Sequence, residues 1–123
     1  MLIKDMKLFK QQAYINGAWV NAVSQQRYGI KNPATHERLG EVPLMGAEDT
    51  QQAINAAEAA LPAWRTLTAK ERASRLRRWF ELMMANQEEL AHIMTLEQGK
   101  PLTEARGEIA YAASFVEWFA EEA

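Results

Sequence analysis

Short strand-like runs of apolar residues give way to helical spacing partway along the chain. In the first part, apolar pairs flank Asn16 and Gly17, a dipeptide that tolerates the positive φ angles of a tight hairpin turn. A break at Asn32 follows, so we expect residues 27–31 to pair with residues 38–42. Residues before the hairpin lack a sustained period and predict a loose arm or a short helical turn.

From Gly46 onwards, apolar positions recur at intervals of three and four, as on one face of a helix. Glu48 and Asp49 give this helix the acidic first turn that complements a positive helix end. Pro62 lacks an amide hydrogen and clashes with a continuing turn, so we expect the helix to end or bend near Leu61. Its apolar positions are Ile54, Ala57, Leu61 and Trp64.

Capping signals predict the next two helices. Thr68 and Glu71 have the spacing of a capping box, so a helix should begin at Ala69. Asn86 is expected to cap a third helix, and Gly99 to end it in the left-handed conformation. The apolar faces expected for the two helices are Leu76, Trp79, Phe80 and Met83, and Leu90, Ile93 and Met94.

A last helix should run from Pro101 to the end of the sequence. Its final turn carries Glu121 and Glu122, which the negative helix end disfavours, and no Gly, Asn or Pro closes it. We therefore expect the chain to be a piece of a larger protein, cut within or just after a helix. The residues expected to be buried along it are Leu102, Ile109, Ala112, Val116 and Phe119.

Composition excludes several classes of protein. The chain has 123 residues, 48% of them hydrophobic, and a formal net charge of −2, which is typical of one ordinary soluble domain. No apolar run approaches the roughly 20 residues that span a bilayer, and no signal peptide is evident, so we expect a cytoplasmic chain with no membrane partner. The sequence contains no cysteine, which removes disulfides and thiolate nucleophiles.

Motif spacing excludes further chemistry. The glycines match neither a dinucleotide fingerprint nor a phosphate-binding loop, and the serines lack a nucleophile elbow. Residues 70–78 hold five cations, of which Arg72, Arg75 and Arg78 could contact a phosphate backbone, but we favour a solvated helix face as their explanation. The near-balance of charges argues against nucleic acid as a partner. The last helix also contains an aromatic cluster, for which we favour a packed core over a ligand-facing surface; it consists of Tyr111, Phe115, Trp118 and Phe119.

A series of short motifs spans essentially the whole chain. They are YINGAW at 14–19, NPAT at 32–35, LGEVP at 39–43, PAWR at 62–65 and TLEQGKP at 95–101. In this order and with these gaps, they resemble the opening of an NAD(P)-dependent aldehyde dehydrogenase. The closing stretch at 107–122 is similar to the succinate-semialdehyde branch and the related glutarate-semialdehyde branch of that family.

The resemblance implies an α+β fragment that is mostly helical, with a β-hairpin and short strands followed by about four helices. It would be part of the Rossmann-type α/β fold of the aldehyde dehydrogenases. Residues 1–123 would form the N-terminal portion of that domain, truncated at its C-terminal end. An arm and short strands would occupy 1–45, and the helical part 46–123.

The resemblance also implies an activity for the parent enzyme, which is expected to be a homo-oligomer. In that family, a cysteine thiolate attacks the aldehyde, hydride passes to NAD or NADP, and a glutamate base activates the water that releases the acid. These groups lie later in the family's polypeptide. We therefore expect no catalytic residue in this chain, no cofactor bound by it, and no activity from it alone. The alternative is a stand-alone helical protein-interaction module.

Two groups of site residues follow from the resemblance. The backbone carbonyl of Ile30 and the side chain of Glu97 would hold a monovalent cation, for which oxygen ligands are suited. Alternatively, Glu97 is only a polar residue near a helix end. Gly107, Tyr111 and Phe115 would line one wall of the substrate tunnel, with core packing as the competing explanation for Phe115.

Overall fold

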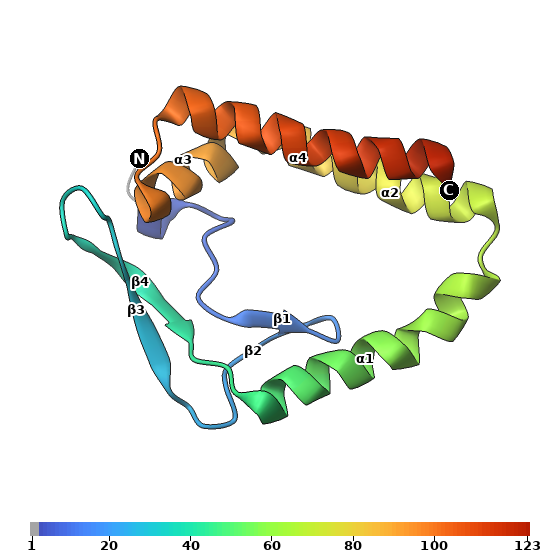
Figure 1. The fold of residues 1–123 in the computed structure, drawn as a ribbon, viewed down its shortest axis with the longest axis horizontal. Helices are drawn as coiled ribbons and strands as arrows, with labels where there is room; N and C mark the ends of the chain where they lie inside the picture. Colours follow the sequence, from blue (N-terminus) through green and yellow to red (C-terminus); the bar gives the residue numbers. More distant parts are fainter. Residues whose placement is uncertain (1–2) are drawn as a thin grey trace. The chain divides into compact units, whose positions relative to one another are not determined.

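The computed structural model describes residues 3–123, which form two compact units that divide between Arg65 and Thr66. The first unit contains a short 3-10 helix, η1 (Ile3–Asp5), four β-strands and almost all of helix α1. The second unit contains helices α2, α3 and α4 (Figure 1). Within the described residues, the strands precede the four α-helices, so the expected mostly helical α+β fragment is confirmed.

The first pair of strands forms the expected hairpin. Strand β1 (Ala13–Ile15) pairs antiparallel with β2 (Ala18–Val20), and Ile15 lies opposite Ala18. Asn16 and Gly17 connect them with φ angles of 52° and 77°. Both angles are positive, as the tight turn requires, which is why this dipeptide predicts the hairpin correctly.

The second pair of strands also follows the prediction. Strand β3 (Arg27–Lys31) pairs antiparallel with β4 (Arg38–Pro43), and the register shifts between Ile30 and Lys31. The Asn32 side chain accepts hydrogen bonds from the backbone amides of Ala34 and Thr35, at 2.9 and 3.3 Å, and so builds the turn that joins the strands.

Helix α1 (Ala47–Thr66) begins where expected but runs four residues beyond Pro62. Of the two outcomes expected near Leu61, an end or a bend of the helix, the end is therefore wrong. The carbonyl of Glu58, which loses its amide partner at Pro62, belongs to an exposed residue, so water can satisfy it at little cost. The apolar side chains of Ile54, Leu61 and Trp64 on this helix are exposed.

Helix α2 (Ala69–Ala85) begins with the predicted capping box of Thr68 and Glu71. Helix α3 (Gln87–Gln98) starts after Asn86, but the Asn86 side chain does not cap it. Instead, this side chain donates a hydrogen bond of 2.7 Å back to the carbonyl of Leu82. Asn86 has φ −113° and ψ 16°, a backbone that completes α2 and differs from the extended backbone of a normal N-cap. Gly99 ends α3 in the left-handed conformation, as predicted, with φ 83°.

Helix α4 (Leu102–Glu122) packs along α2, and near its start also against α3 (Figure 1). Its buried residues are Ala105, Ile109, Ala113 and Ala120. The expected burial of Ile109 is confirmed, whereas Ala112 and Phe119, also expected inside, are exposed. Small side chains let two helix axes approach closely, so an alanine stripe lies inward and the bulky residues lie outward.

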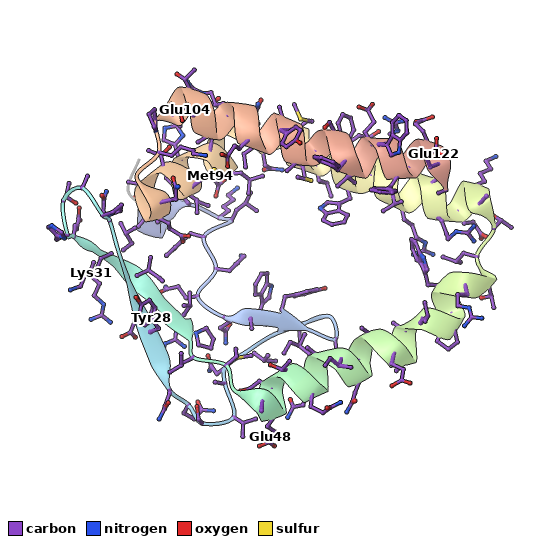
Figure 2. All side chains as sticks on the ribbon, in the orientation of Figure 1. Tyr28, Lys31, Glu48, Met94, Glu104 and Glu122 are labelled. Carbon is purple, nitrogen blue, oxygen red and sulfur yellow. The ribbon has the colours of Figure 1, made fainter. Side chains whose placement is uncertain are left out.

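The core of the second unit is small. Ala91, Ala105 and Ile109 form its buried centre, and Leu90, Met94 and Leu102 pack against them. Figure 2 labels Met94 on α3, and Glu104 and Glu122 near the two ends of α4. Among the described residues, no large side chain is fully buried, and each of the four tryptophans is at least 37% exposed.

Candidate functional site

The outer side of α4 carries a continuous set of exposed aromatic residues, which we call the aromatic face: Tyr111, Phe115, Trp118 and Phe119. Their exposed fractions are 67%, 49%, 62% and 59%. The rings of Tyr111 and Phe115 meet edge to face, with centroids 4.9 Å apart and planes at 76°. The packed core that we favoured for this aromatic cluster is therefore wrong for this chain, because the cluster lies on its surface.

Gly107 extends the aromatic face by one turn towards the start of α4. Gly107, Tyr111 and Phe115 follow one another at intervals of four and lie on one side of the helix. A Cβ atom added at Gly107 would meet no other atom within 4 Å, so the space beside it is open. All three residues expected to line a tunnel wall are exposed, and Phe115 is not part of the buried core.

A hollow of about 670 Å³ lies at the C-terminal end of the aromatic face. Phe115, Trp118 and Phe119 supply its apolar lining, and the polar lining is Ser114, Glu117 and Glu121. The Ser114 hydroxyl donates to the Tyr111 carbonyl at 2.6 Å, so it is already engaged within the helix. Sequence reasoning missed these polar residues. The spacing of Ser114 and Glu121, three residues from Tyr111 and Trp118 respectively, could have indicated them, whereas no such spacing marks Glu117.

Ion pairs fix α4 to α2 beside this hollow. Arg77 donates to Glu117 at 2.8 Å and also pairs with Glu121. Arg72 donates to the carbonyls of Leu67 and Ala123, the latter at 3.2 Å. Arg78 also pairs with Glu81, at 3.5 Å. Three cations of the basic stretch at 70–78 are thus engaged within the unit, which favours the solvated helix face over a phosphate-binding surface.

The two residues expected to hold a cation lie in different units. Ile30 is half-buried in β3, directly before the register shift, and Glu97 is in the last turn of α3. Glu97 is exposed as a whole, yet nearby protein atoms partly desolvate its carboxyl group and raise its pKa. A carbonyl oxygen and a carboxylate are donors suited to a hard cation. Within residues 3–123, no group of three or more His, Asp or Glu side chains could hold a metal ion.

The described residues contain no parallel β-sheet. Both sheets consist of two antiparallel strands, whereas a dinucleotide cradle needs a parallel strand, a glycine-rich turn and a helix in succession. In the same residues, no helix is long and apolar enough to cross a membrane.

Comparison with known proteins places the chain among dehydrogenases. Residues 19–123 match the sequence model of the aldehyde dehydrogenase family. The chain is 66% identical over 123 residues to the glutarate-semialdehyde dehydrogenase of Pseudomonas aeruginosa, covering 100% of this chain and 26% of that protein. It is 62% identical over 122 residues to the NADP(+) succinate-semialdehyde dehydrogenase of Escherichia coli, covering 99% of this chain and 25% of that protein.

The chain is also similar in structure to a solved enzyme. The crystal structure of an E. coli NADP-dependent enzyme superposes with a TM-score of 0.93 and 63% sequence identity, over 96% of this chain and 24% of that chain. The chain thus spans about a quarter of the length of the relatives that it matches. The ordered motifs, the fold and these similarities agree, and the chain belongs to the aldehyde dehydrogenase family.

Proposed function

We propose that the chain is the N-terminal part of an NAD(P)-dependent dehydrogenase that oxidises succinate or glutarate semialdehyde to the corresponding acid. The observation that carries this proposal is the identity of 62–66% to enzymes named for these two aldehydes, over essentially the whole chain. The name of the E. coli relative includes NADP(+), which supports NADP as the first cofactor to test and NAD as the second. We further propose that the parent is a cytoplasmic homo-oligomer.

By itself, the chain is catalytically inactive. It has no cysteine to serve as the thiolate nucleophile, and its described residues do not form a dinucleotide cradle. When bound in the parent, the nicotinamide cofactor supplies the hydride acceptor. This chain therefore helps to shape the site and to position the reacting groups, and it does not supply those groups itself.

Within the parent, α4 forms one wall of the substrate tunnel through Gly107, Tyr111 and Phe115. Their exposure and the open space beside Gly107 support this role, because a wall must be accessible and must leave room for substrate. The aromatic surfaces suit the methylene chain that separates the aldehyde from the carboxylate of these substrates.

The Ile30 carbonyl and Glu97 contribute two ligands to a monovalent cation site in the parent, and a third comes from outside this chain. The oxygen donors support such a cation. Glu97 is directly followed by residues that form the corner at Gly99 and Pro101, so a cation there would stabilise the junction of α3 and α4.

A chimera tests the proposed activity. Residues 1–123 would replace the matching quarter of the E. coli succinate-semialdehyde dehydrogenase, and NADP reduction would be followed with succinate and glutarate semialdehyde. We expect the chimera to turn over within about tenfold of the E. coli enzyme, because the new segment keeps the fold and the site. The isolated chain should reduce no cofactor.

Two results would contradict the proposal. One is a chimera that assembles like the E. coli enzyme but oxidises neither semialdehyde. The other is measurable turnover by the isolated chain. For the tunnel wall, Gly107→Leu in the chimera should slow turnover, since the new side chain enters open space beside Tyr111, whereas Thr103→Ala, one turn earlier and also exposed, is the matched control.

A thermal melt with a hydrophobic dye separates this proposal from a stand-alone interaction module. The module would melt cooperatively and bind little dye, whereas a segment of a larger enzyme exposes apolar surface that its parent covers. The exposed tryptophans, among them Trp79 at 54% and Trp118 at 62%, support strong dye binding.

A further inference from the structure

The tip of the β1–β2 hairpin combines a reactive sequence with an unprotected position. Asn16 and Gly17 are both exposed, and a Cβ at Gly17 would meet nothing within 4 Å. In the described part of the chain, no hydrogen bond restrains the side-chain amide of Asn16. Asparagine followed by glycine occurs only at this position among the five asparagines of the sequence.

The hairpin that holds this turn is short and stands alone. Its strands have three residues each, and the sheet that they form contains no third strand. Open hollows of about 340 and 520 Å³ lie between this hairpin and α1, so the helix does not pack tightly against the turn. An isolated two-stranded hairpin is marginally stable in water, and such a turn opens readily.

We propose that Asn16 is a site of spontaneous deamidation, with water as the co-reactant. When the turn opens, the backbone nitrogen of Gly17 attacks the side-chain carbonyl carbon of Asn16. A carbon–nitrogen bond forms between them, the bond to the side-chain nitrogen breaks, and ammonia leaves with the proton of the Gly17 amide. Water then opens the resulting succinimide ring and gives aspartate or isoaspartate. No oxidant or reductant is involved.

The isoaspartate product changes the hairpin. Its main chain runs through the former side chain of residue 16 and is one methylene longer, within a loop that has only two residues. The register that places Tyr14 opposite Trp19 depends on that loop length. The ring contact of these residues, with centroids 5.2 Å apart, and the position of the Lys10 ammonium 5.7 Å from the Trp19 ring centroid, depend on it as well.

Peptide mapping by mass spectrometry tests the proposal on the full chain. The protein would be incubated in native buffer at mildly alkaline pH, and isoaspartate would be quantified at each asparagine over time. We expect deamidation at Asn16 to be about tenfold faster than at Asn21, because Gly17 has no Cβ to obstruct the attack whereas Ala22 does. Asn32 is an internal control, since Pro33 has no amide hydrogen to lose.

Variants measured in urea separate chemistry from folding. In urea the chain is unfolded, so a substitution changes the rate only through local chemistry. Gly17→Ala should slow deamidation at Asn16 about tenfold under these conditions, because it adds the missing Cβ. Asn16→Gly should abolish isoaspartate at the hairpin. If Asn16 deamidates no faster than Asn21 in native buffer, the proposal is wrong. This holds even if Asn16 deamidates rapidly in urea, because the folded hairpin would then prevent the reaction.

Discussion

Paired substitutions on α4 test which of its faces is buried. Ile109 is 7% exposed and packs against Ala91 and Ala105, whereas Phe119 is 59% exposed on the aromatic face. We expect Ile109→Ala to destabilise the chain more than Phe119→Ala does, although Phe119 has the larger side chain.

The structure sets the magnitudes. Ile109→Ala removes three buried carbon atoms at roughly 0.8 kcal/mol each and leaves a cavity between α3 and α4, so the free energy of unfolding should fall by roughly 2–4 kcal/mol. Only about two-fifths of Phe119 is buried, which limits the loss for Phe119→Ala to about 1 kcal/mol. Alanine is a better helix former than either residue, by a similar small amount, so this effect does not alter the comparison.

Urea unfolding, followed by far-ultraviolet circular dichroism, measures both losses. The midpoint should shift for Ile109→Ala without a change in the denaturant slope, which would show that stability and not compactness has changed. If Phe119→Ala costs as much as Ile109→Ala, or about 3–5 kcal/mol as for a fully buried phenylalanine, the assignment of the buried face is refuted.

Three further substitutions test local features by the same unfolding measurement. Gly99→Ala should cost about 1 kcal/mol or more, because alanine is strained at a φ of 83°, and an unchanged midpoint would argue against the left-handed end of α3. Thr68→Ala should cost about 1 kcal/mol by removing the cap of α2, whereas Lys70→Ala, in the same turn, should cost little. Asp49→Asn should change the pH dependence of stability. Backbone amides of Gly46 and Val23, at 2.8 and 2.9 Å, lower the pKa of Asp49, so its contribution is present above the pKa of the unfolded chain and is lost as pH falls through the lower folded pKa. Equal loss of stability in acid by the variant and the original chain would contradict this.

Features set by local chemistry could be predicted from the sequence. The turn at Asn16 and Gly17 needs two positive φ angles, and few other dipeptides supply them. The capping box at Thr68 is satisfied by atoms three residues away, so no distant contact is required. The left-handed end of α3 at Gly99 is similarly local.

Features that depend on neighbours or on solvent could not be predicted in the same way. Pro62 is tolerated inside α1 because the carbonyl that loses its partner is on an exposed residue, a fact that sequence spacing does not contain. Asn86 has the residue type of an N-cap, but α2 and α3 meet there with a single residue between them, and its backbone completes the preceding helix. For the candidate site, the family resemblance named Gly107, Tyr111 and Phe115, and their intervals of four put them on one side of α4, but the sequence could not decide whether that side is exposed.

The two faces of α4 explain why the burial of this helix was hard to predict. Small residues alternate with bulky ones around it, so its apolar positions form two stripes, and periodicity alone favours the stripe with larger side chains. Packing favours the other stripe, because Ala105, Ala113 and Ala120 allow α2 and α3 to approach the α4 backbone closely, which aromatic side chains would prevent. Arg77 then reaches across from α2 to Glu117 and holds that orientation. An outward aromatic face is thus a direct consequence of close packing on the inside, and it leaves α4 with a second apolar surface suited to substrate or to further protein.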